Sequence, residues 1–94
     1  MADEQKERPY DKVMDSDLSI ALWKREGRHG PYLSSSGVEK TYEDDQGKLR
    51  ITRSLSGVGE HLRAGKLHER ASDRIVAFKD QMRADRAQSK DRER

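Results

Sequence analysis

The chain has 94 residues, of which 31% are hydrophobic and 40% charged, and it contains no cysteine. This length and composition allow one small domain with a thin core, and they exclude a disulfide framework and a zinc–thiolate site. No apolar run approaches the roughly 18 residues of a membrane span, and the acidic N-terminus is unlike a signal peptide, so we expect a cytoplasmic protein with no membrane partner.

The charges are nearly balanced, with 20 Lys and Arg against 18 Asp and Glu, but they are unevenly distributed. Residues 18–78 hold eleven bases and eight acids and are therefore mildly basic. This excess gives little support for a nucleic-acid partner, because such partners usually select a larger and more concentrated basic patch. A thin core also favours a dimer, in which a second copy supplies additional burial.

The hydrophobic pattern divides the chain into three parts. Residues 1–16 show no hydrophobic period and are predicted to form a disordered or loosely ordered N-terminal tail. Residues 17–82 are predicted to form the single small domain. Residues 83–94 are predicted to be a charged extension, either a solvated helical end or a disordered segment.

A first strand is predicted to begin at Leu18. Leu18, Ile20 and Leu22 alternate with small or polar residues up to Trp23, which is typical of a strand with one buried face. A glycine-rich loop over residues 27–31 is expected to end this strand.

A second extended run covers residues 32–42, but its alternation is imperfect. Leu33 and Val38 lie five positions apart, so a regular strand would place them on opposite faces. One extra residue at Gly37 would return both to the same face, and glycine is common in β-bulges. A bulge is therefore predicted at Gly37.

A turn and a third strand follow. Asp44-Asp45-Gln46-Gly47 has the chemistry of a type I turn, in which aspartate caps the backbone and glycine takes the left-handed position. Residues 48–55 then return as a strand with Leu49, Ile51 and Leu55 on one face. A calcium-loop interpretation of the acidic residues lacks the ligand spacing and the terminal glutamate that such loops need.

After Gly57 the hydrophobic period becomes helical. Apolar residues recur at steps of three to five, which predicts one amphipathic helix that ends at about Met82 and is capped at Ser56 or Gly57. The predicted apolar stripe consists of Val58, Leu62, Leu67, Ala71, Ile75, Phe78 and Met82.

Together these elements predict an α+β fold, in which an antiparallel sheet of three to four strands precedes one long C-terminal amphipathic helix, with a homodimer as the expected assembly. The helix is expected to cover the sheet face that carries Leu18, Ile20, Leu22, Leu49 and Ile51. The opposite face is expected to expose Trp23, Tyr32, Arg50 and Thr52.

Five short motifs stand in order along the chain. They are Ile20–Trp23, Gly30-Pro31-Tyr32, Lys40-Thr41-Tyr42, Asp44–Lys48 and Ala71–Ile75. Over roughly residues 9–78 the chain thereby resembles a family of small uncharacterised proteins from bacteria and their plasmids or phages. That family is similar in layout to the Whirly and transcriptional-coactivator type of single-stranded-DNA-binding domain. By analogy of fold, the resemblance implies a dimer whose curved sheet binds nucleic acid.

The chain departs from the family pattern in two places. It has one extra residue near Gly37, and Leu49 stands where the family often has an aromatic residue. The second departure removes a stacking side chain if that position faces outward.

A single-strand binder needs basic side chains for the phosphates and aromatic faces for the bases. The predicted nucleic-acid-binding residues are Trp23, Lys24, Arg25, Tyr32, Lys40, Lys48, Arg50 and Arg53. In the alternative interpretation, Trp23 packs against a partner chain or beneath the tail, and the basic residues form a solvated face.

No set of residues combines a nucleophile, a base and an orienting group, so we expect no catalysis, no cofactor and no small-molecule substrate. His61 and His68 would lie about 10 Å apart on the helix, too far to share a metal without a further ligand. The sequence therefore predicts a homodimeric single-stranded DNA- or RNA-binding protein, such as a transcriptional regulator or coactivator. The alternative is a protein-interaction or regulatory module, an inhibitor or adaptor, without nucleic-acid affinity.

Overall fold

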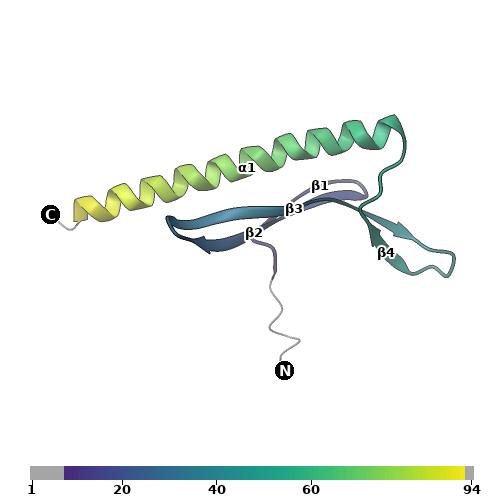
Figure 1. Ribbon diagram of the computed structural model, residues 1–94, viewed down its shortest axis with the longest axis horizontal. Helices are drawn as coiled ribbons and strands as arrows, with labels where there is room; N and C mark the ends of the chain where they lie inside the picture. Colours follow the sequence, from purple (N-terminus) through teal and green to yellow (C-terminus); the bar gives the residue numbers. More distant parts are fainter. Residues whose placement is uncertain (1–7, 93–94) are drawn as a thin grey trace, which may run out of the picture.

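The computed structural model of the protein describes residues 8–92 as an antiparallel sheet with one long helix along one of its faces (Figure 1). The four strands lie side by side in the order β1-β2-β3-β4. The elements are β1 (Asp11–Asp15), β2 (Leu18–Gly27), β3 (Gly30–Glu43), β4 (Leu49–Thr52) and α1 (Gly57–Arg92). The predicted α+β layout is confirmed.

Strand β1 lies inside the segment predicted to be a loose tail, so the domain begins earlier than residue 17. Val13 is fully buried in the core, and a tight turn with Ser16 at φ 57° joins β1 to β2. One inward-facing apolar residue is too few to produce a hydrophobic period, which is why the sequence pattern missed this strand. Residues 1–7 of the predicted tail lie outside the described residues.

The predicted β-bulge is present at Gly37. Ile20 pairs with Val38 and Leu22 with Ser35, so two residues of β3 oppose the single residue between them on β2. Gly37 has a φ of 96°, in the left-handed region that favours glycine. The extra residue returns Val38 to the face of the sheet that packs against the core.

Two glycines give opposite predictions for substitution by alanine. Gly37→Ala should lower the free energy of unfolding by about 1–2 kcal/mol, because a Cβ is strained at positive φ although no atom lies within 4 Å of it. Gly65→Ala, in open space in the interior of α1, should raise it by about 1 kcal/mol. Urea unfolding followed by circular dichroism measures the stability of both variants. Stability changes of the same sign would contradict the positive φ of Gly37 or the helical conformation of Gly65.

The core lies between α1 and the β1–β3 part of the sheet. Leu18, Ile20 and Leu22 of β2 are completely buried, as predicted, and Leu67 and Phe78 of the helix cover them. Burial of each such side chain contributes about 1.5–3 kcal/mol relative to exposure. This thin layer is the main source of stability in a chain with so few apolar residues.

The predicted apolar stripe is wrong at its start. Val58 and Leu62 are 75% and 64% exposed, and Ala64 is buried instead. The step of five residues from Leu62 to Leu67 rotates the side chain by about 140° around the axis, which separates the two halves of the stripe. Helix α1 also continues past Met82 to Arg92, so the charged extension is helical in its described part.

The face predicted for the apolar residues of β4 is also wrong. Ile51 pairs with Thr41 and Leu49 with Glu43, on the side of the sheet away from α1, where they are 65% and 74% exposed. Lys40 of β3 lies on the opposite side of the sheet, the side that faces α1, because its ammonium group contacts Glu60 of the helix. The prediction that Leu49 and Ile51 share one face is therefore confirmed. Which face of the sheet they occupy is set by the register of the β3–β4 hairpin.

Candidate nucleic-acid interface

The sheet face turned away from α1 is called the open face, and its β2–β3 end carries three of the predicted binding residues. Trp23 and Arg25 alternate with inward residues on β2, and Tyr32 pairs with Arg25 across the hairpin. The guanidinium of Arg25 lies 5.7 Å from the centroid of the Trp23 ring, a cation–π distance. These three residues, called the aromatic cluster, combine two ring faces with one positive charge.

Gly27 makes room for the ring of Tyr32 in the aromatic cluster. A Cβ atom at Gly27 would lie 2.9 Å from the ring of Tyr32, so only glycine leaves space for the ring to lie across β2. Tyr32 remains 45% exposed, while Trp23 is half-buried. The aromatic cluster is therefore a fixed and partly solvent-accessible surface.

The other predicted basic residues do not join the aromatic cluster. Lys24, Lys40 and Arg50 lie on the side of the sheet that faces α1, as the register of the two hairpins requires. Arg53 follows β4, and Lys48 lies just before it at the far hairpin, which projects away from the helix in Figure 1. The expectation that Trp23 and Arg50 share a face is therefore wrong.

Three of these bases are held by carboxylates of the chain itself. Lys40 Nζ lies 2.6 Å from Glu60 Oε2, and Arg50 Nε lies 2.8 Å from Asp44 Oδ2. Arg53 Nη2 lies 3.5 Å from an oxygen of Glu39. Such pairs leave less uncompensated positive charge at these three positions for a phosphate backbone.

The acidic turn explains the position of Arg50. Oδ1 of Asp44 accepts hydrogen bonds from the amides of Gln46 and Lys48, both at 2.9 Å, and Gly47 has the predicted left-handed conformation. The hydrogen bond from Arg50, followed by the bond from the amide of Lys48, lowers the pKa of the Asp44 carboxyl. Asp44 therefore serves the turn, as predicted.

The Lys40–Glu60 pair ties β3 to the start of α1. Glu60 also accepts a hydrogen bond from the amide of Ser56, so its carboxylate closes the first turn of the helix. The hydrogen bond from Lys40, and then that from the Ser56 amide, lowers the pKa of Glu60 below its ordinary value of 4.5. The pair is structural and holds Lys40 away from the open face.

Glu60 should carry part of the acid sensitivity of the fold. Because its pKa is lowered on folding, its stabilising contribution is present above about pH 4.5 and is lost as the pH falls through the folded-state value. Glu60→Gln should therefore flatten the fall in melting temperature between roughly pH 5 and pH 2. Glu69→Gln, at an exposed site on the same helix, is the control. An acid transition in Glu60→Gln identical to that of the wild type would contradict this role.

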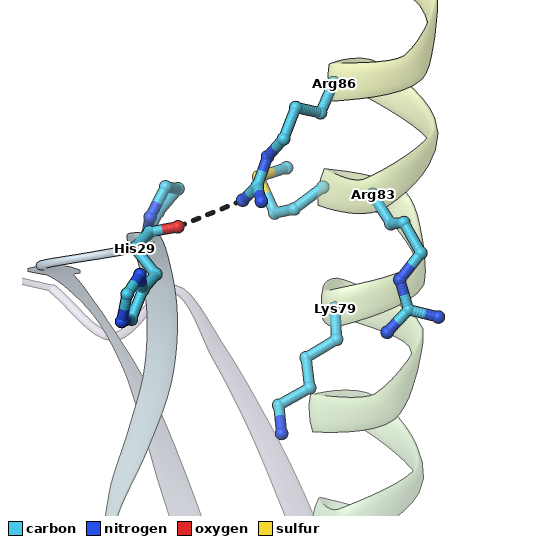
Figure 2. A pocket seen from close by; sticks show the side chains of 6 residues that line it. His29, Lys79, Arg83 and Arg86 are labelled. Carbon is cyan, nitrogen blue, oxygen red and sulfur yellow. Dashed lines mark hydrogen bonds between the residues drawn. The ribbon is translucent and has the colours of Figure 1, made fainter.

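A second positive feature was missed by the sequence analysis. The C-terminal half of α1 passes beside the β2–β3 hairpin (Figure 1). A cavity of about 210 Å³ opens between them, and Figure 2 shows the side chains that line it. This hairpin pocket is lined by His29, Pro31, Lys79, Met82, Arg83 and Arg86. Lys79, Arg83 and Arg86 are spaced by four and three residues, a helical spacing that could have indicated one basic face.

The hairpin pocket is strongly positive for its size. Its lining includes three cationic side chains and no carboxylate. Arg86 Nη2 donates a hydrogen bond of 3.0 Å to the carbonyl oxygen of His29, which fixes the guanidinium against the hairpin. Pro31 forms part of the wall, and the next residue, Tyr32, belongs to the aromatic cluster. The pocket and the cluster therefore lie on opposite faces of the same hairpin.

Comparisons of the chain with family models, with curated proteins and with solved structures each found no match. The resemblance described above therefore depends on its short motifs alone. Within residues 8–92 no helix is long and apolar enough to span a membrane. In the same part of the chain no three His, Cys, Asp or Glu residues come together as metal ligands would, and His61 and His68 are both exposed.

Proposed function

We propose that this protein binds single-stranded DNA or RNA at the end of the molecule formed by the β2–β3 hairpin and the C-terminal half of α1. The observation that carries the proposal is that the aromatic cluster and the positive hairpin pocket lie on the two sides of one hairpin, with Tyr32 of the cluster next in sequence to Pro31 of the pocket. Stacking surfaces and a nearby track of positive charge are the two parts that sequence-tolerant single-strand binders share.

Each part has a distinct role in binding. Trp23 and Tyr32 offer ring faces to unstacked bases, and each stacked base contributes about 1–3 kcal/mol by the usual measure of alanine substitution. Arg25, over Trp23, adds positive charge beside the stacked bases. Lys79 and Arg86 supply positive charge from the helix side of the hairpin.

A fluorescence titration tests this function directly, because Trp23 is the only tryptophan of the chain. An unlabelled single-stranded oligonucleotide should quench its emission, and the affinity should fall steeply between about 50 mM and about 200 mM salt. Inorganic polyphosphate, a polyanion without bases, is the control and should bind without stacking on Trp23. Absence of both quenching and salt-dependent binding would overturn the proposed function.

A second candidate function, a protein-interaction module, is supported by a different part of the open face. Leu49 and Ile51 are the most exposed apolar residues of the sheet and lie on β4, an edge strand. An exposed apolar edge can pair with another chain, including a second copy of this one. Sedimentation equilibrium of the wild type and of Ile51→Lys would show whether this edge mediates a homodimer, and a monomeric wild type would contradict that assembly.

A further inference from the structure

We propose that the hairpin pocket is a phosphate-binding site. If the protein binds single strands as proposed above, the ligand there is a backbone phosphate of the bound strand. This inference deepens the proposed function and rests on it for the source of the phosphate, but the chemistry of the pocket can be tested separately.

The donors of the pocket come from two sides. Figure 2 shows Lys79 and Arg86 extending from α1 towards the hairpin, where Arg86 contacts the carbonyl group of His29. That contact uses one terminal nitrogen of a guanidinium that carries five N–H donors, so others remain for an anion. Arg83 also lines the pocket, with its guanidinium turned outward in Figure 2, and rotation of its side chain would add a third cation.

The positive charge of the pocket is poorly compensated by the chain. Asp80 lies 4.0 Å from Arg83 at an exposed site, a long ion pair of the kind that contributes little. Asp85 accepts a hydrogen bond from Gln81 and does not line the cavity. Among residues 8–88, whose side chains the structure describes, Lys79 has no carboxylate partner. A bound anion would therefore relieve repulsion among neighbouring cations.

The donor types favour phosphate over a single carboxylate. A guanidinium can donate two parallel hydrogen bonds to phosphate oxygens, and a lysine adds a compact point charge. A volume of about 210 Å³ with an open mouth admits a phosphate group that remains attached to a chain. Because Pro31 lines the pocket and Tyr32 lies in the aromatic cluster, one strand could place a base and a phosphate on the two sides of this hairpin.

The first test titrates inorganic pyrophosphate into the isotope-labelled protein at constant ionic strength. Saturable NMR shifts are expected at the amides of His29 and Gly30 and at the Nε–H of Arg86. The double variant Lys79→Gln/Arg86→Gln should lose these shifts. Lys66→Gln, which removes an exposed charge of the same helix outside the pocket, should keep them. Absence of saturable shifts in the wild type, or identical shifts in the double variant, would overturn the phosphate site.

The second test identifies the source of the phosphate with a single-stranded oligonucleotide. The slope of log affinity against log salt should shrink by about 0.7 in the double variant, because one phosphate contact is removed, and stay unchanged in Lys66→Gln. An unchanged slope in the double variant would overturn the pocket as a strand contact while the proposed function stands. Pyrophosphate shifts without any oligonucleotide binding would support the phosphate site and overturn the proposed function.

Discussion

Replacement of Leu67 by alanine is expected to lower the free energy of unfolding by about 2–5 kcal/mol. Leu67 is 1% exposed and packs against the completely buried leucines and isoleucine of β2. Truncation removes apolar contacts and leaves a cavity that a thin two-layer core can refill only by moving the helix or the sheet. Since small domains have about 5–15 kcal/mol of total stability, this single change removes a large fraction of it.

The chain offers a matched control for this variant. Leu62 lies on the same helix but is 64% exposed, so Leu62→Ala should change the stability by no more than about 0.5 kcal/mol. Urea unfolding followed by far-ultraviolet circular dichroism measures both variants under the same conditions. Equal losses in the two variants would show that α1 presents a different face to the sheet.

Tyr32→Ala is expected to lower the affinity for a single-stranded oligonucleotide by about 5- to 150-fold, which corresponds to the loss of one stacked base. Tyr32 is accessible and belongs to the aromatic cluster, whereas Trp23 stays in place as the fluorescent reporter. The ring of Tyr32 also covers Gly27, so thermal unfolding should be measured beside binding to correct for any loss of folded protein.

Tyr42 is the matched control for Tyr32. The two side chains are 43% and 45% exposed, but Tyr42 lies on the other side of β3, opposite Arg50. Tyr42→Ala should therefore leave the oligonucleotide affinity within about twofold of the wild type, because no base would stack there. If both tyrosine variants lost the same affinity, the open face would not be the stacking surface.

Much of the fold could be predicted from local patterns. The alternation of Leu18, Ile20 and Leu22 has the period of a strand with one buried face, and these residues are buried as predicted. The five-residue spacing of Leu33 and Val38 required an extra residue, and Gly37 supplies it at positive φ. In both cases the signal lies within a few residues, where the steric rules of the backbone decide the outcome.

The errors arose where the outcome depends on how separate elements pack. A hydrophobic period shows that Leu49 and Ile51 share a face, but only the pairing of β3 with β4 decides which face of the sheet it is. Likewise, Lys40 was predicted to bind nucleic acid, but the fold places the carboxylate of Glu60, which lies 20 residues later in the chain, beside its ammonium group. Ion pairs between distant residues leave no periodic signal in a sequence.

The hairpin pocket was missed for the same reason. Arg86 belongs to the charged extension predicted for residues 83–94, a solvated helical end or a disordered segment, and Lys79 lies near the predicted end of the amphipathic helix. Their importance depends on the length of α1, which carries them past the core to the β2–β3 hairpin. The aromatic residues of that hairpin were identified from sequence. Lys79 and Arg86, the cations on its other side, lie on α1 more than forty residues later in the chain.

The measurement that tests the central claim most directly is NMR mapping of the intact protein with a single-stranded oligonucleotide. Shifts are expected at the indole N–H of Trp23, at the amide of Tyr32, and around Lys79 and Arg86 of the hairpin pocket. These positions lie far apart in sequence and meet only at the β2–β3 hairpin. Shifts confined to β4 around Ile51, or no shifts at any position, would contradict the claim that this end of the molecule binds nucleic acid.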